Sequence, residues 1–116
     1  MAGHTITITP SSAHVEVVVN GTTLAESDRP VLLDETGLPT RYYLHRDDVR
    51  VDLRPTNFHT TCPFKGQASY WSLELDGEVF DGIVWSYPTP IAGAEAIAGL
   101  MCFYPERVEM KVDPTG

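Results

Sequence analysis

The sequence predicts a mainly β (α+β) fold, in which compact antiparallel sheets form a small sandwich or an open barrel with one short helix near residues 90–99. Two turn dipeptides, Asn20-Gly21 and Asp76-Gly77, each stand between apolar β-type segments and supply the positive φ angles of a two-residue hairpin. Several short segments also alternate apolar and polar residues, which is typical of strands with one face in the core.

Length and charge narrow the class of protein. At 116 residues the chain has the size of one domain, which we expect over residues 14–113 after an N-terminal arm at residues 1–13. The net charge of −8 argues against a nucleic-acid partner. No segment approaches the roughly 20 apolar residues of a membrane span, and the first residues lack the basic start and apolar run of a signal peptide. We therefore expect a cytoplasmic protein with no membrane partner.

The first hairpin follows a short alternating segment. Thr5–Thr9 is typical of a strand or an extended arm that is either disordered or paired elsewhere. Across the two-residue turn Val17 should pair with Leu24, so the inward face should hold Val15, Val17, Val19 and Leu24.

Three further strands are expected before the second hairpin. They cover residues 31–33, 41–44 and 49–54. In the last of them, the apolar residues expected to point inward are Val49, Val51 and Leu53. Pro55 should end this strand, because proline cannot donate a ladder hydrogen bond.

The second hairpin should pair residues 69–75 with residues 78–85. A two-residue loop then places Leu73 opposite Phe80, Tyr70 opposite Ile83 and Ala68 opposite Trp85. The residues expected on one face are Trp71, Leu73, Leu75, Phe80 and Val84. Those expected on the other face are Ala68, Tyr70, Ile83, Trp85 and Tyr87. Both faces are apolar, so the second must cover a core, a partner or a ligand.

The last third of the chain contains the expected helix. Thr89 and Pro90 are typical of a helix start, and the alanine-rich segment after them favours helix until Gly99. A closing pair of strands is expected at residues 100–104 and 107–112.

A short turn at residues 62–66 carries the candidate catalytic residues, Cys62 and Lys65. Pro63 favours a tight turn that brings them to within about 7 Å between Cα atoms. A nearby ammonium lowers the pKa of a thiol, and His59 could add to that effect or act as a base. The alternative is structural, because a half-buried thiol, a solvated lysine and a polar strand residue account for the same positions.

Metal and phosphate chemistry have less support. His59-x-x-Cys62 has the spacing of a metal-ligand pair that Cys102 or His45 could complete, but structural zinc normally uses two such pairs. Lys65-Gly66 lacks the strand, glycine spacing and helix of a P-loop. We therefore expect no metal and no cofactor. Both cysteines should be reduced, because the chain carries no export signal.

An aromatic wall should stand beside this turn. The hairpin register places Tyr70, Trp85 and Tyr87 at the end of the sheet nearest Gly66. Large apolar walls with a few polar tips are typical of ligand pockets, so these three residues and His59 are the predicted ligand-binding residues. The alternative is that the same aromatic residues simply fill a core.

The same positions also carry a resemblance to a known family. The residues concerned are Tyr42-Tyr43 with Asp48-Val49, Thr61-Cys62-Pro63-Phe64-Lys65-Gly66 with Ala68 and Tyr70-Trp71, Trp85-Ser86-Tyr87-Pro88, and Ile97-Ala98-Gly99 with Phe103-Tyr104. Through them the chain resembles the family catalogued as domain of unknown function 427, which also has a nucleotidyltransferase-like label, over about residues 14–113. The resemblance implies a compact β-rich domain, found singly or in tandem, and selects no reaction.

The sequence thus leads to three functional hypotheses. The first is a cytoplasmic domain, either a pure binding protein or a small enzyme, that takes a small anionic or carbonyl-bearing metabolite between the Cys62–Lys65 turn and the Trp85–Tyr87 strand. The second is a non-catalytic protein-interaction or homodimerisation module that uses the second apolar face of the hairpin. The third is a transferase or hydrolase that acts on a phosphorylated metabolite through Lys65.

Overall fold

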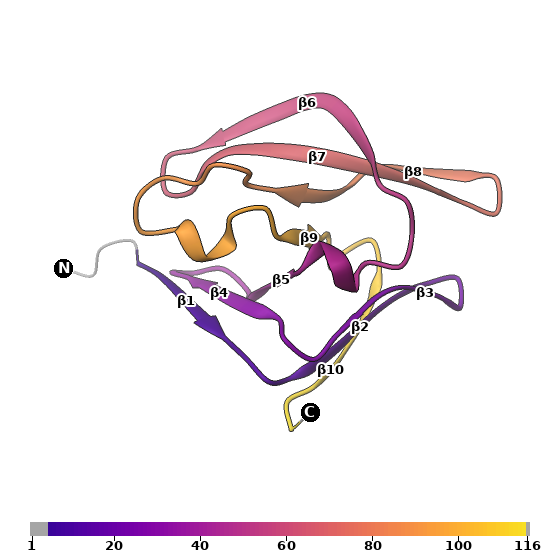
Figure 1. The fold of residues 1–116 in the computed structure, drawn as a ribbon, viewed down its shortest axis with the longest axis horizontal. Helices are drawn as coiled ribbons and strands as arrows, with labels where there is room; N and C mark the ends of the chain where they lie inside the picture. Colours follow the sequence, from indigo (N-terminus) through magenta and orange to yellow (C-terminus); the bar gives the residue numbers. More distant parts are fainter. Residues whose placement is uncertain (1–4, 116) are drawn as a thin grey trace.

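The computed structural model describes residues 5–115, and these form ten strands in two antiparallel sheets with no α-helix (Figure 1). The larger sheet has the strand order β1 (Ile6–Pro10), β4 (Val31–Glu35), β5 (Arg41–Leu44), β9 (Met101–Phe103), β8 (Glu78–Ser86), β7 (Gly66–Leu75) and β6 (Arg54–Cys62). The smaller sheet has the order β10 (Glu109–Asp113), β2 (His14–Val19) and β3 (Thr22–Ser27). The predicted mainly β fold class is confirmed, and the larger sheet is not closed into a barrel. No helix among the described residues is long and apolar enough to cross a membrane.

The central strands of the larger sheet, β5, β9 and β8, are buried on both faces. On one face, residues such as Leu44, Val84 and Phe103 form a first core with the inward residues of β2 and β3. The smaller sheet covers this face (Figure 1). The predicted inward set of the first hairpin is confirmed, since Val15, Val17, Val19 and Leu24 all belong to this core.

A second core lies on the opposite face of the same strands. It contains Tyr43, Trp85 and Cys102 from the centre of the sheet, together with residues of β1, β4 and β7. These strands can share one core only because the larger sheet curls around it. The segment at residues 88–100 contributes Ile97 and Leu100, and Figure 1 shows this segment, in orange, between the β6–β7 end of the sheet and strands β1 and β4.

The first hairpin has the predicted turn and a shifted register. Asn20 and Gly21 have φ angles of 51° and 79°, as a type I′ turn requires. A bulge follows, so that Val17 pairs with Ala25 and the predicted Val17–Leu24 pair is wrong. The extra residue in β3 lets Leu24 and Ala25 both enter the first core.

The second hairpin also has its predicted turn, with Asp76 and Gly77 at φ angles of 50° and 81°, and the predicted pairing of Leu73 with Phe80. Further from the turn the register shifts. Tyr70 pairs with Trp85, so the predicted pairs Tyr70–Ile83 and Ala68–Trp85 are wrong.

A bulge in β8 causes this shift. Between the Leu73–Phe80 and Trp71–Val84 pairs, β7 has Ser72 alone, whereas β8 has Asp81, Gly82 and Ile83. The Ser72 hydroxyl organises the bulge, because it donates to Asp81 Oδ1 at 2.7 Å and accepts from the Gly82 N–H at 2.9 Å.

The bulge changes the face of one residue only. A shift of two residues preserves the alternation of side chains, so the other residues stay on their predicted faces. The face with Trp71 packs against the first core, and the face with Trp85 packs against the second. Ile83, which lies inside the bulge, joins the first core, and its predicted place beside Trp85 is wrong.

Two other expected elements are absent from the described residues. Residues 49–53 are not a strand, although Val49, Val51 and Leu53 do pack against the first core as predicted. A short 3₁₀ turn at Arg46–Asp48 precedes them, and β6 begins at Arg54 and continues through Pro55. Val49 makes only an isolated bridge with Ala25, so the alternating pattern reports burial here and not a continuous strand.

The helix predicted from Pro90 to Gly99 is also wrong, because only a 3₁₀ turn at Glu95–Ile97 is present. The Ile91 N–H donates to the Lys65 carbonyl and Gly93 has a φ of 96°, so the backbone cannot continue a helix through these positions.

The strands at the two ends of the chain pair with distant partners. β9 lies between β5 and β8, whereas β10 pairs with β2, so the two closing strands do not form a pair with one another. The expected arm pairs elsewhere, since β1 runs antiparallel to β4 at the edge of the larger sheet. Residues 1–4 of that arm lie outside the described residues.

A glycine substitution tests how the turn before β7 is held. Gly66→Ala is expected to lower the free energy of unfolding by roughly 2–3 kcal/mol, because the φ of Gly66 is +117°, far from the left-handed region that alanine can enter. Gly77→Ala is the control and should cost roughly 1 kcal/mol, because its φ of +81° lies closer to that region and a Cβ there meets open space. Urea denaturation measures both losses, and equal losses would contradict the prediction.

Candidate functional site

The candidate site is a cavity of about 160 Å³. It lies where the end of β4 meets the turn before β7, a part of the curled larger sheet that we call its rim. Four of the six predicted site residues, Lys65, Tyr70, Trp85 and Tyr87, line it together. The other lining residues come from the end of β4, the β4–β5 connection, the start of β5 and the position after β9, and they are Glu35, Leu38, Arg41 and Tyr104.

The turn before β7 has the predicted form. The Lys65 N–H donates to the Cys62 carbonyl at 3.2 Å, which closes the turn, and the Ile91 N–H donates to the Lys65 carbonyl at 3.0 Å. A Cβ on Gly66 would touch the backbone of residues 89–91 at 3.4 Å. The turn therefore lies directly against the segment that covers the second core.

Lys65 is not the solvated lysine of the structural alternative. Its ammonium donates to Glu35 Oε1 at 2.8 Å, and the two side chains are only 12% and 8% exposed. The same ammonium lies 5.9 Å from the centre of the Tyr87 ring. Because Glu35 ends β4 and Lys65 precedes β7, this ion pair joins two parts of the curled sheet that are far apart in strand order.

Trp85 is held in the wall of the cavity by other aromatic residues. Its indole N–H donates to the Tyr43 hydroxyl at 3.0 Å, and the two rings meet edge to face. The Tyr104 ring lies 4.5 Å from Trp85 between ring centres. Burial raises the pKa of Tyr43 and of Tyr87 well above the ordinary value, and burial together with a hydrogen bond to Tyr70 raises the pKa of Tyr104 to about 12. At neutral pH these phenols are therefore neutral.

Arg41 is a cavity residue that sequence reasoning missed. Its guanidinium carbon lies 5.3 Å from the centre of the Trp85 ring, and its Nη1 lies 3.6 Å from Glu106 Oε1. Arg41 stands two residues before Tyr43 on β5, so both point to the same face of the sheet. Arg41 comes close to Trp85 only because β5 and β8 both pair with β9. No local pattern in the sequence contains this long-range strand order.

The remaining two predicted site residues do not line the cavity. Cys62 is half-buried at the end of β6 and packs against the second core. His59 is exposed on β6, where its Nδ1 lies 3.5 Å from the Ser69 hydroxyl. Cys62 and Cys102 are both free thiols, and burial raises the pKa of Cys102 well above the ordinary value. Residues 5–115 contain no group of three His, Cys, Asp or Glu side chains placed to hold a metal ion.

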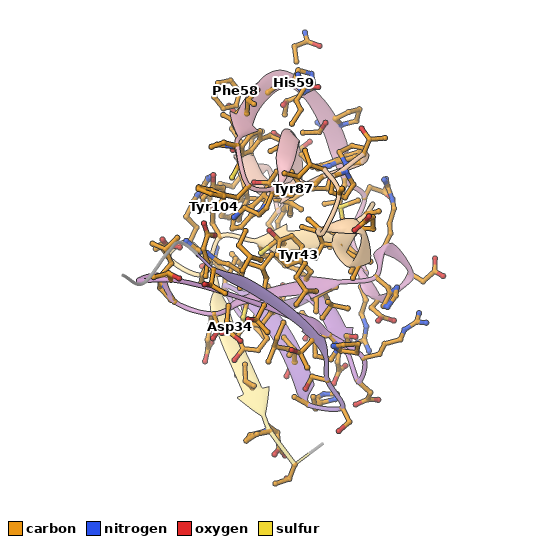
Figure 2. The ribbon with its side chains drawn as sticks, turned by 90° about the vertical axis from the view of Figure 1, so that its left-hand side faces the viewer. Asp34, Tyr43, Phe58, His59, Tyr87 and Tyr104 are labelled. Carbon is orange, nitrogen blue, oxygen red and sulfur yellow. The ribbon has the colours of Figure 1, made fainter. Side chains whose placement is uncertain are left out.

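A larger cavity of about 390 Å³ adjoins the first and shares Tyr70 and Tyr104 with it. Its other lining residues are Thr56, Asn57, Phe58, Asp81, Gly82 and Arg107. The ladder between β6 and β7 is interrupted between Pro55 and His59, and this irregularity supplies three of those residues. Figure 2 shows Phe58 and His59 on this outer strand, above Tyr87 and Tyr104.

Comparison with known proteins assigns the chain to a family. The model described as "Domain of unknown function (DUF427)" matches residues 7–114. The chain belongs to the DUF427 family. The resemblance drawn from the Cys62–Gly66 and Trp85–Pro88 motifs is thus confirmed, and the DUF427 match also includes most of β1. No curated protein matches the chain.

The ion pair at the rim of this DUF427 domain is open to a direct test. Lys65→Met is expected to lower the free energy of unfolding by roughly 3 kcal/mol, because it leaves the buried Glu35 carboxylate without its ammonium partner. Replacing both partners, as Lys65→Met with Glu35→Gln, should recover part of that loss. Arg54→Met is the control, since it breaks the exposed Arg54–Glu74 pair and should cost less than about 1 kcal/mol. Urea denaturation that gives equal losses for both single variants would contradict a structural role for Lys65.

The catalytic hypothesis for Cys62 makes a separate prediction about thiol reactivity. If the Lys65 ammonium stabilises the Cys62 thiolate, iodoacetamide should alkylate Cys62 faster than a free cysteine at neutral pH, and the Lys65→Met/Glu35→Gln variant should lose this advantage. Cys102, which is 1% exposed, should react only on unfolding and serves as the internal control. Mass spectrometry of the peptides reads out both thiols. A Cys62 rate equal to that of free cysteine would remove nucleophilic catalysis from this turn.

Proposed function

We propose that this DUF427 domain binds a small anionic metabolite in the cavity at the rim of the curled sheet. The observation that carries the proposal is the presence of two cations, Arg41 and Lys65, beside an aromatic wall of Trp85, Tyr87 and Tyr104. A concave site with large apolar walls and a few polar groups is the usual form of a small-molecule site.

The charge of the cavity supports an anion. Arg41 and Lys65 against Glu35 leave one net positive charge among the lining residues, whereas the whole chain carries −8. A cleft lined by one sign of charge raises the local concentration of the opposite ion. Arg41 is the better contact, because the Lys65 ammonium already donates to Glu35, whereas Arg41 is 3.6 Å from its carboxylate neighbour and presents a planar fork of donors.

The Arg41 and Lys65 side chains can also donate hydrogen bonds to a carbonyl oxygen. The proposal therefore includes a small enzyme that acts on a carbonyl-bearing metabolite. In such an enzyme Cys62 would supply the nucleophile from the turn, three residues before Lys65, and would have to reach the cavity from its place against the second core. Action on a phosphorylated metabolite would depend on Arg41 as well as Lys65, because a phosphate prefers an arginine fork. We also propose a cytoplasmic location, which two free thiols in one chain support.

The interaction-module hypothesis has an observation of its own. The second apolar face of the hairpin, for which this hypothesis was made, packs in the second core. β6, however, is one of the two outer strands of the larger sheet, and its Phe58 is 60% exposed. An exposed edge strand with an aromatic side chain is a place where a second copy of the chain could pair. The binding proposal and this one differ in whether a small molecule or a protein contacts the rim.

A metabolite-library thermal-shift screen tests the proposal. Anionic metabolites should raise the melting temperature of the wild-type domain, and Arg41→Met should weaken their binding by roughly 1.5–3 kcal/mol, because it removes a charged hydrogen-bond donor. The fold should lose only about 1 kcal/mol, since Arg41 makes a single ring contact and one long ion pair.

Arg46→Met is the matched control for this screen. Arg46 lies 4.6 Å from the centre of the Trp71 ring on the other face of the sheet, so its removal deletes the same kind of contact without touching the cavity. Binding should be unchanged in this variant. A library without any hit, together with concentration-dependent dimerisation in gel filtration, would favour the interaction module instead.

A further inference from the structure

We propose that the ligand of this domain is an aromatic acid that occupies both adjoining cavities, with its anionic group at Arg41 in the smaller one and its ring beside Phe58 in the larger one. This inference rests on the proposed function and names the ligand class for the same site.

The sizes of the two cavities indicate a ligand with two parts. The smaller cavity, at about 160 Å³, lies below the range of roughly 300–1,000 Å³ that small-molecule sites usually occupy, so it has room for a charged group and little more. The larger cavity, at about 390 Å³, lies within that range. Tyr70 and Tyr104 line both, so a ligand that fills the two lies across these rings.

The charges of the two cavities set the orientation of the ligand. In the larger cavity the lining charges are Asp81 and Arg107, which cancel, and Arg107 Nη1 donates to the Asp81 carbonyl oxygen at 2.7 Å. In the smaller cavity Arg41 and Lys65 exceed Glu35 by one positive charge. The anionic group therefore belongs in the smaller cavity and the uncharged part of the ligand in the larger one.

The larger cavity is built from aromatic rings. The Phe58 and Tyr70 rings pack with 5.0 Å between centres at an angle of 52°, and Tyr104 completes the wall. Aromatic rings favour such tilted contacts with a further ring, which distinguishes an aromatic ligand from an alkyl chain of similar area. Gly82 also lines this cavity, and the space beside it is open, because a Cβ built on it meets nothing within 4 Å.

Backbone irregularities on both sides create this space. The interrupted β6–β7 ladder lets residues 56–58 lie at the cavity, and the β8 bulge contributes Asp81 and Gly82. Phe58 is 60% exposed although it takes part in a ring contact, so its free face is available to a ligand. Bulges that redirect side chains in this way are frequent beside functional sites.

Three probes separate the parts of the inference: propionate, 3-phenylpropionate and 3-phenylpropionamide. NMR titration of the ¹⁵N-labelled domain should show 3-phenylpropionate binding at least about tenfold more tightly than propionate, because only the former places a ring among aromatic residues. It should also bind at least about tenfold more tightly than the amide, which lacks the charge that Arg41 recognises.

Two variants then locate each part. Phe58→Ala should weaken 3-phenylpropionate by about fivefold or more and leave propionate unchanged. Val79→Ala is the matched control, because Val79 is equally exposed at 60% and does not line either cavity. Arg41→Met should weaken both acids and leave the amide unchanged. Phe58 is exposed, so its replacement should not disturb the fold.

The outcomes separate this inference from the function on which it rests. If both acids bind with equal affinity and depend on Arg41, or if Phe58→Ala and Val79→Ala behave alike, the aromatic-acid inference is wrong while anion binding stands. If the amide binds as tightly as the acid, the negative charge is not recognised, and the aromatic-acid inference and the anion-binding proposal are both wrong. If a full library and all three probes fail to bind, both the proposed function and this inference fall.

Discussion

The burial of three short strands on both faces is the constraint on which the rest of this structure depends. β5, β9 and β8 send Leu44, Phe103 and Val84 to the first core and Tyr43, Cys102 and Trp85 to the second. An antiparallel sheet with two apolar faces needs cover on each side. The smaller sheet covers one face, and the larger sheet covers the other by curling its own outer strands around it. A sheet that curls without closing leaves a rim, and the candidate site lies at that rim.

The Lys65–Glu35 ion pair is the feature that gives this rim a definite shape. Removing two charges from water is costly, and a hydrophobic pair of similar volume could stabilise the domain as well or better. What an ion pair adds is a defined position, since its geometry joins the end of β4 to the turn before β7. The aromatic residues beside it are then held at fixed distances from one another. Lys65 thus shapes the cavity and leaves Arg41 as the cation most able to meet a ligand.

Sequence reasoning predicted what depends on neighbouring residues and missed what depends on distant ones. Asn20-Gly21 and Asp76-Gly77 fix their turns through positive φ angles, so both hairpins and the faces of Trp71 and Trp85 were predictable. The bulges at Leu24 and Gly82 were not, because they depend on how the far ends of the hairpins fit the cores. The alanine-rich segment after Pro90 has helical propensity, but its backbone bonds to Lys65 and Tyr87 instead. Three site residues, Tyr70, Trp85 and Tyr87, were found through the alternation of the hairpin strands, and Lys65 was found through the turn at Pro63. Arg41 and Glu35 reach the site through long-range pairing that no local pattern contains.

The motifs that identify the DUF427 family are explained largely by architecture. Gly66 is required by its φ angle, Lys65 by its ion pair with Glu35, and Trp85 by its hydrogen bond to Tyr43. Residues with such structural roles specify the curled sheet and its rim without specifying what binds there. Arg41 and Phe58 lie outside those motifs, and each places a side chain in a cavity while contributing little to either core. The family motifs therefore account for features of the fold of this chain, and the proposed ligand binding has to be tested at Arg41 and Phe58.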